Sequence, residues 1–261
     1  MEGTNNNNEK DFLKTLARGI DLIKSFDTNN PRMTLTEVAR KNDMSRASAR
    51  RFLLTLKRLG FIMQVDDRFQ FTAKILDIGY QYLANLDFIE VITPFMREVS
   101  RSLGKACSAA VLDGVDVIYV ARIPSQQQIL SVNLHIGSRL PAYCTSIGRV
   151  LLASLSDQEL DSFFDRVELK QRTIQTVISE KKLREIIKQV RLKGYAVVDQ
   201  ELEESLRSIA VPVHNSKGDV LCAMNVGMPV VRIKMKNAVK ACLPVLKEAA
   251  EKAEMVLVHH P

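Results

Sequence analysis

The sequence predicts an α+β fold built from two unequal parts, and three observations carry this prediction. Within residues 11–73, three segments with the apolar spacing of helices precede two short alternating segments typical of a β-hairpin. Beyond them, strand-like runs around turn signals alternate with capped helical segments, without an internal repeat. The chain of 261 residues is also long enough for two domains of ordinary size.

Composition narrows the class of protein. The chain is 46% hydrophobic and 26% charged, which is typical of a globular protein. It has no run of about 18 apolar residues, and residues 1–10 lack the apolar core of a secretory signal. We therefore expect a disordered polar tail over residues 1–10, a cytoplasmic protein and no membrane partner.

The cysteines and histidines give no sign of a metal or a disulfide. The four cysteines are widely spaced and form no CxxC pair, and the four histidines lack metal-ligand spacing. We expect reduced thiols, no metal site and no cofactor.

Positive charge is concentrated near the N-terminus. The chain carries a net charge of +7, and residues 32–58 alone carry +6. Such a local excess predicts contact with a polyanion at that place.

Three helices are expected in this basic region. Apolar spacing predicts the first over residues 11–26. Thr34 and Glu37 form the capping box of the second helix, while Ser45 is expected to cap the third. The third helix is expected to end at Gly60.

The third helix has an unusual first half, with three arginines and no acidic residue. Cations near a helix N-terminus oppose its dipole, so the arrangement indicates an anionic partner outside the chain. Together with the hairpin over residues 61–72, the three helices are expected to form a winged helix-turn-helix over residues 11–73. In such a motif the last helix enters the major groove, so we expect it to bind double-stranded promoter DNA. The alternative is a solvated basic face that binds only protein. The residues expected to bind DNA are Thr36, Ser45, Arg46, Ala47, Ser48, Arg50, Arg51 and Arg68.

A linker helix over residues 74–87 and a second domain over residues 88–261 are expected to follow. Pro94 is tolerated early in a helix over residues 88–103, which ends at Gly104. Asp113-Gly114 marks a hairpin. Further helices are expected from Ser146, from Ser156, from Ser179 to Gly194 and over 234–257, with strands over 128–134, 195–199, 206–213 and 219–227.

The second domain lacks the motifs of common enzymes. It has no GxSxG elbow, no phosphate-binding loop and no GxGxxG, so we expect no catalytic residues. A purely architectural dimerisation domain is the alternative. That alternative predicts a filled apolar interior, which the polar strand residues Ser208 and Asn225 contradict.

Three stretches resemble a known family. TLTEVARKNDMSRASARRFLLTLKRLGFI resembles the DNA-binding domain of the IclR family of bacterial transcription regulators, and GSRLPAYCTSIGRVLLA and GYAVVDQELEESLRSIAVPV resemble its effector-binding domain. The amino-acid sequence of several segments is most similar to that of the PcaR/PcaU/PobR branch of the family. The resemblance implies a GAF/profilin-like second domain and an activator of aromatic-acid catabolism genes of the β-ketoadipate pathway. A ligand-released repressor of another small-acid operon is the alternative.

The resemblance also implies a set of effector-binding residues. By motif these are Ser146, Ile147, Asp199, Ser208, Asn225 and Gly227. Many family members have two consecutive acids where this chain has Val198-Asp199, so we expect a less polar pocket in this chain.

The chemistry of an acid ligand adds further candidates. Backbone N–H groups at Ser146-Ile147-Gly148 suit a carboxylate, and Arg122 or Arg139 could add a bidentate contact. Tyr143 and Ile147 could cover a ring. Each residue also has a structural alternative, such as a turn glycine or a surface ion pair.

We expect protocatechuate as the effector, with 4-hydroxybenzoate and β-ketoadipate as alternatives. One winged helix covers only half of a DNA site, so we also expect self-association. Apolar residues of the linker helix, among them Ile75, Tyr82 and Leu86, would take part. The sequence leaves dimer and tetramer open.

Overall fold

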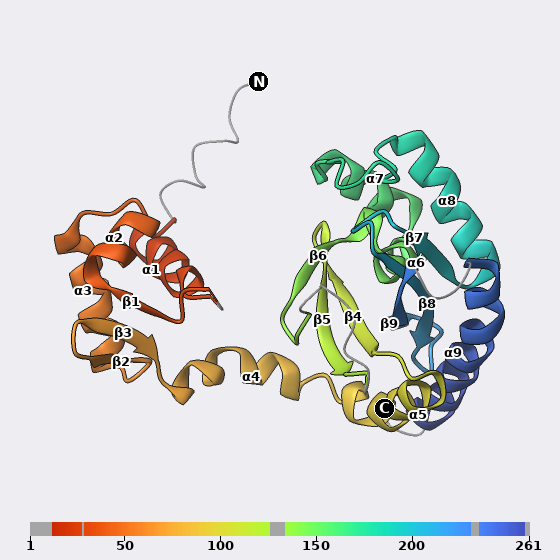
Figure 1. Cartoon of the computed structure of the whole chain (residues 1–261), viewed down its shortest axis with the longest axis horizontal. Coiled ribbons are helices and arrows are strands. Elements are labelled where there is room, and N and C mark those ends of the chain that lie inside the picture. Colours follow the sequence, from red (N-terminus) through yellow and green to blue (C-terminus); the bar gives the residue numbers. More distant parts are fainter. Residues whose placement is uncertain (1–11, 28, 126–133, 231–234, 259–261) are drawn as a thin grey trace. The chain divides into compact units, whose positions relative to one another are not determined.

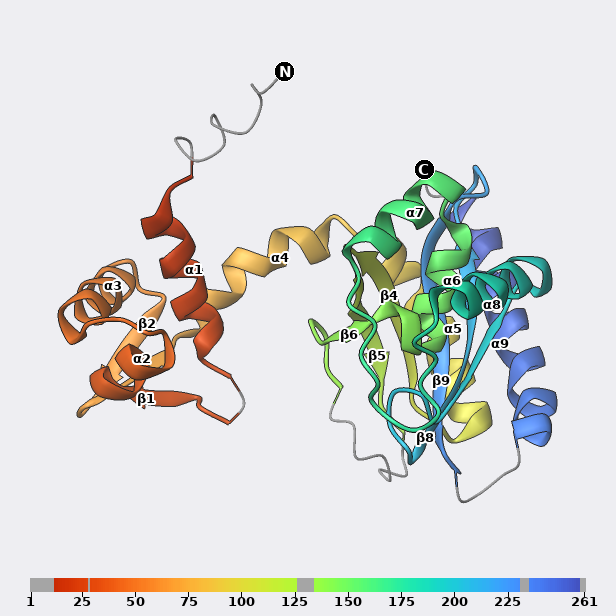
Figure 2. The same ribbon diagram turned by 90° about the horizontal axis from the view of Figure 1, so that it is seen from above.

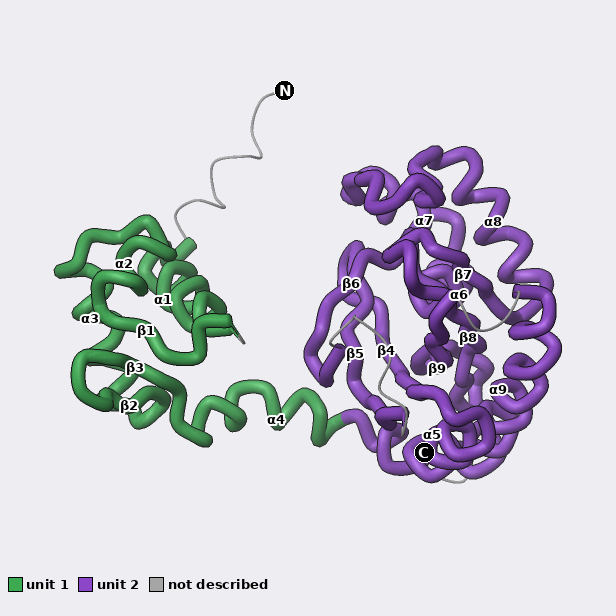
Figure 3. The backbone as a smooth tube through the Cα atoms, viewed as in Figure 1, with its two compact units in different colours: residues 1–85 green, residues 86–261 purple. Residues whose placement is uncertain are grey.

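The computed structural model describes residues 12–27, 29–125, 134–230 and 235–258. The chain divides into two compact units, residues 1–85 and 86–261 (Figure 3). The expected tail over residues 1–10 and nearly all of the expected strand over 128–134 lie outside the described residues. The α+β fold predicted from the sequence is confirmed.

Unit 1 contains the three expected helices and the hairpin (Figure 1). The helices pack on a shared core that includes Leu22, Val38 and Leu53. The hairpin gains a third antiparallel strand, β1, which pairs with β3 and was not predicted. The elements are α1 (Lys14–Ser25), β1 (Arg32–Thr34), α2 (Leu35–Lys41), α3 (Arg46–Arg58), β2 (Ile62–Val65) and β3 (Arg68–Phe71).

The helix ends of unit 1 follow the expected capping chemistry. Thr34 and Glu37 form both hydrogen bonds of the capping box, and Ser45 Oγ accepts the N–H of Ser48. Gly60 follows α3 with φ of +83°, a conformation that favours glycine. The first helix begins at Lys14 rather than at residue 11, because residues 12 and 13 are not helical.

A short helix ends unit 1. After the 3₁₀ turn η1 (Ala73–Ile75), α4 runs over Leu76–Ala84, three residues short of the expected end. It leaves Leu76, Ile78, Tyr80 and Tyr82 exposed.

Unit 2 is a six-stranded antiparallel sheet of order β6-β5-β4-β9-β8-β7 with helices on both faces (Figures 1 and 2). One core joins the sheet to α5 and α9, while a second core joins it to α6, α7 and α8. The strands are β4 (Cys107–Asp113), β5 (Asp116–Ile123), β6 (Arg139–Pro141), β7 (Ala196–Asp199), β8 (Leu206–His214) and β9 (Val220–Pro229). The helices are α5 (Phe88–Leu103), η2 (Ala142–Cys144), α6 (Ser146–Ser154), α7 (Asp157–Arg166), α8 (Glu180–Lys193) and α9 (Met235–Leu257).

Most elements of unit 2 agree with the sequence prediction to within two residues. The expected helix over residues 88–103 is α5, with Gly104 left-handed after it. The hairpin at Asp113-Gly114 joins β4 and β5. Strand β6 was not predicted, since it has only three residues. No described helix is long and apolar enough to cross a membrane.

The two faces of the sheet carry side chains of different size. Toward α5 and α9, β8 presents Ile209, Val211 and Val213, which pack in the first core. The alternate residue Ser208 belongs to the opposite face, and so does Asn225 on β9. Small and polar residues on this second face fill less space, which leaves room for a cavity beside α6.

Candidate functional site

Helix α3 exposes the arginines that the sequence singles out. The side chains of Arg46, Arg50 and Arg51 are exposed. Within the described ranges, no carboxylate lies within 4.0 Å of their guanidinium groups. Leu54 is also exposed on this helix. The surface is therefore cationic and available to a polyanion such as DNA.

The other residues expected at the DNA surface play several structural roles. Thr36 and Ala47 are exposed, whereas Ser45 caps α3 and Ser48 is half-buried. Arg68, at the start of β3, donates to the carbonyl of Arg32 and pairs with Glu37 over 3.4 Å. The structure thus ties Arg68 to the start of α2, and its contact with DNA stays a prediction.

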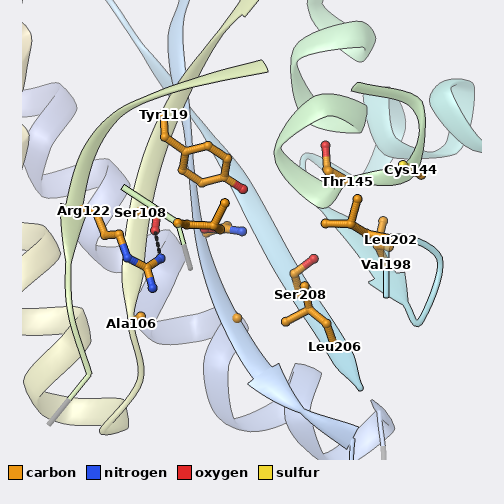
Figure 4. Close-up of a pocket in the computed structure, with 13 residues that line it drawn as sticks. Ala106, Ser108, Tyr119, Arg122, Cys144, Thr145, Val198, Leu202, Leu206 and Ser208 are labelled. Atoms are coloured by element: carbon orange, nitrogen blue, oxygen red, sulfur yellow. Dashed lines mark hydrogen bonds between the residues drawn. The ribbon is translucent and has the colours of Figure 1, made fainter. Parts of the chain in front are cut away.

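A cavity lies on the second face of the sheet in unit 2 (Figure 4). It encloses about 570 Å³ of empty space, its solvent-open mouth included. Its walls come from β4, β5, β7, β8 and β9, from η2 and the residue that caps α6, and from the segment between β7 and β8. The lining residues are Ala106, Ser108, Tyr119, Arg122, Leu134, Cys144, Thr145, Val198, Leu202, Leu206, Ser208, Asn225 and Gly227.

Four of the expected effector residues line this cavity: Arg122, Ser208, Asn225 and Gly227. The register of the sheet explains why they meet. Ser208 on β8 lies opposite Gly227 on β9, and Asn225 on β9 lies opposite Ser108 on β4. Ser108 in turn lies opposite Arg122 on β5. Residues directly opposite one another share a face, so four strands contribute to one wall.

A β-bulge in β5 adds Tyr119 to the same wall. Ala109 of β4 pairs with Ala121, whereas Ala110 pairs with Tyr119, so Val120 has no partner of its own. The extra residue resets the alternation of the strand. Tyr119 and Arg122 therefore both line the cavity, although an odd number of positions separates them.

Arg122 is the only charged residue among the described residues that line the cavity. Its Nη1 donates to Ser108 Oγ (the dashed line in Figure 4), and the two atoms are 3.1 Å apart. Burial lowers the pKa of Arg122 from its usual value, but a guanidinium stays charged in proteins. In the described chain no carboxylate pairs with it. An anionic ligand would offset the cost of burying this cation.

The hydroxyl and thiol groups of the lining are neutral. Burial raises the pKa of Tyr119 to about 12 and that of Cys144 to about 11. The Tyr119 hydroxyl has no hydrogen-bond partner among the residues that the structure describes. It remains available as a donor to a ligand.

The turn that leads into α6 touches the cavity through Cys144 of η2 and Thr145, the N-cap of α6, rather than through the expected residues. Ser146 and Ile147 are fully buried and do not line the cavity. Gly148 donates its N–H to Thr145 Oγ1, and a Cβ there would lie 2.1 Å from the carbonyl oxygen of Ala142. The glycine therefore serves close packing. A role for these three residues in effector binding remains a hypothesis.

The other expected effector residues are also outside the cavity lining. The Tyr143 hydroxyl donates to the carbonyl of Lys170 and accepts its N–H. Asp199 pairs with Arg207 on the neighbouring strand over 2.6 Å. Arg139 pairs with Asp113 and Asp116 at the surface. Each of the three therefore has a structural partner, and its role in effector binding stays a prediction.

A buried ion pair beside the cavity was not predicted. Arg149 of α6 donates to Glu201 over 2.6 Å, and Glu201 also accepts the N–H of Val177. Thr176 Oγ1 donates to the Glu201 carbonyl. These bonds hold the segment that carries Leu202, a lining residue. Nothing local in the sequence distinguishes Glu201 from its acidic neighbours Glu203 and Glu204, which are half-buried and exposed.

A helix-turn-helix unit with an exposed cationic helix, in one chain with a cavity-bearing unit, defines a transcription regulator. Residues 15–66 match the IclR helix-turn-helix domain, and residues 80–255 match the C-terminal domain of bacterial transcriptional regulator IclR. The chain belongs to the IclR family of bacterial transcriptional regulators.

Relatives within the family are similar over nearly the whole chain. The chain is 38% identical over 242 residues to the Pca regulon regulatory protein of Pseudomonas putida, covering 93% of this chain and 83% of that protein. It is 31% identical over 245 residues to the p-hydroxybenzoate hydroxylase transcriptional activator of Acinetobacter baylyi, covering 92% and 90%. These similarities confirm the branch that the motifs predict.

Two solved structures are similar in fold and sequence. A candidate transcriptional regulator of Rhodococcus sp. RHA1 matches with a TM-score of 0.84 and 40% identity, covering 96% of this chain and 100% of that one. A double mutant of the PobR inducer-binding domain from Acinetobacter, in complex with 3-hydroxybenzoic acid, matches with a TM-score of 0.59 and 30% identity. This match covers 63% of this chain and 96% of that one.

Proposed function

We propose that the cavity of unit 2 binds a small aromatic acid and that binding controls transcription from DNA held by unit 1. The single observation that carries the proposal is Arg122, the one charged lining residue among those described, which has no carboxylate partner in the described chain. A ligand carboxylate would supply that partner through a charge-assisted hydrogen bond.

The remaining lining suits a hydroxylated ring. Ser208 and Asn225 offer hydrogen bonds from the sheet, and Tyr119 offers a neutral hydroxyl. Val198, Leu202 and Leu206 supply apolar surface.

The names of relatives support an aromatic acid as the ligand. One relative regulates the Pca regulon, another activates p-hydroxybenzoate hydroxylase, and the similar inducer-binding domain holds 3-hydroxybenzoic acid. We expect protocatechuate first, with 4-hydroxybenzoate and β-ketoadipate as alternatives. On this account the chain is a cytoplasmic, homo-oligomeric activator and not an enzyme. The alternative, a ligand-released repressor, uses the same cavity.

Thermal unfolding of the full chain with candidate acids tests the proposal. A ligand at 100 times its dissociation constant stabilises the folded state by about 2.7 kcal/mol, so the melting temperature should rise. The Arg122→Gln variant should lose most of that rise while melting near the wild-type temperature without ligand. The proposal is wrong if no acid stabilises the wild type, or if the variant responds equally.

A further inference from the structure

A second concave site lies in unit 1, between α1 and α3. Helix α1 contributes Thr15 and Arg18, and α3 contributes Ser48, Arg51, Phe52 and Thr55. The groove holds about 560 Å³ of empty space, open solvent included. It borders the cationic surface of α3, because Arg51 belongs to both.

The chemistry of the groove favours an anion. It presents two guanidinium groups and three side-chain hydroxyls and contains no acidic residue. In the described part of the chain, no carboxylate lies within 4.0 Å of Arg18 or Arg51. Thr55 donates its hydroxyl to the Arg51 carbonyl over 2.8 Å, which leaves the two arginines, Thr15 and Ser48 as donors. Phe52 packs close to Gly19 of α1 and joins the two helices.

Arg18 lies apart from the apolar surface of the same helix. Leu16 and Ile20 are exposed on α1, and Leu13 is exposed just before it. At about 100° per residue, Arg18 is about 160° around the helix from Leu16 and from Ile20. A partner that covers the apolar residues would therefore leave the groove open.

We infer that this groove binds a phosphate of the DNA backbone beside the major groove that α3 enters. A helix lying in the major groove has a phosphate backbone on either flank, and one flank of α3 is the groove with α1. Arg18 and Arg51 would contact the phosphate from two helices, and Thr15 and Ser48 add hydroxyl donors. The inference rests on DNA binding by the helix-turn-helix unit and does not depend on the effector.

A phosphate contact has a measurable signature. It weakens all sequences alike when removed, and each contact contributes about 0.9 to the slope of log affinity against log salt concentration. A base contact would instead change the preference for one sequence.

The test measures binding of the full chain to two duplexes of unrelated sequence between 50 and 200 mM salt, roughly the range over which phosphate contacts are lost. Arg18→Ala should lower affinity for both duplexes by the same factor and reduce the slope by about 0.9 per bound domain. Arg18→Lys should keep most of the slope. Arg101→Ala, which removes an exposed arginine from α5 in unit 2, is the matched control and should change neither quantity.

Three outcomes overturn the inference. In the first, Arg18→Ala gives the same slope of log affinity against log salt concentration as Arg101→Ala. In the second, Arg18→Ala changes the preference between the two duplexes without changing that slope. The third is that inorganic phosphate binds in an Arg18-dependent way, in a titration followed by thermal unfolding, while the DNA slope is unaffected. The groove would then be a small-anion site. If the wild type binds neither duplex, the DNA-binding premise itself fails, whereas effector binding by unit 2 is still measurable.

Discussion

Arg149 and Glu201 form an ion pair in the interior of unit 2, with their side chains 3% and 9% exposed. The Nη2 and Oε2 atoms are 2.6 Å apart, and Arg149 Nε also donates to the carbonyl of Tyr143 over 3.0 Å. The pair joins α6 to the segment between β7 and β8. Because Thr145, which caps α6, and Leu202 in that segment both line the cavity, the pair connects two of its walls.

Breaking this pair from one side should be strongly destabilising. Glu201→Gln leaves a buried guanidinium without its counter-charge, which costs about 3–5 kcal/mol of unfolding free energy. Urea denaturation followed by circular dichroism measures the loss. Glu248→Gln, which breaks the exposed pair with Lys252, is the control and should cost less than about 1 kcal/mol. Equal effects of the two variants would show that the buried pair is unimportant.

The first half of α3 should govern DNA affinity. Arg46→Ala or Arg50→Ala should each cost about 1–3 kcal/mol if the side chain contacts a base, and relax preference at one position. A site selected from random duplexes with the wild type provides the probe for a mobility-shift assay. Intact binding by the variant with both changes would mean that α3 is not the recognition helix.

The full chain should self-associate. Helix α4 leaves Leu76 and Tyr80 at 70% and 62% exposure, so apolar surface remains for a second copy to cover. Light scattering at micromolar concentration should give at least twice the chain mass of 29.4 kDa. Ile78→Lys and Tyr82→Lys together should lower that mass or weaken association. A monomeric wild type would contradict this expectation.

The four cysteines should be unreactive in the folded protein. All are buried and free, and burial raises the pKa of each thiol, to about 11 for Cys144 and about 12 for Cys222. A raised pKa favours the neutral thiol, so at pH 8 the thiolate of Cys144 is only about one part in a thousand. An aromatic disulfide reagent should titrate no thiol rapidly until denaturant exposes all four. A fast native thiol at pH 8 would contradict the burial.

Local signals in the sequence were sufficient for most of the fold. Helix ends depend on contacts within one helical turn, so they can be recognised from the sequence without knowledge of tertiary contacts. Examples are the capping boxes Thr34-Glu37 and Ser156-Glu159 and the helix-ending glycines Gly104 and Gly194. Strand β1 was missed because its three residues become a strand only by pairing with β3, more than thirty positions away.

The site was only partly predictable, for a related physical reason. Ser208, Asn225 and Gly227, predicted from motif resemblance, and Arg122, predicted from the chemistry of an acid ligand, line one cavity because of the strand register. Tyr119 was not predicted, because the β-bulge places its side chain on the opposite face of the sheet from the one that regular alternation along β5 would give. The alternation of apolar and polar residues in the sequence does not reveal such a bulge. Asp199 and Arg139 have ion-pair partners that lie opposite them or on another strand, so their surface roles become visible only in three dimensions.

The most direct test of the central claim is calorimetric titration of the full chain with protocatechuate and with its methyl ester. The ester keeps the ring and its hydroxyls but removes the charge that Arg122 would meet. We predict that the acid binds and that the ester binds at least about tenfold more weakly, which corresponds to about 1.4 kcal/mol. In Arg122→Gln the two affinities should converge. Equal affinity of acid and ester for the wild type would contradict a carboxylate anchored at Arg122.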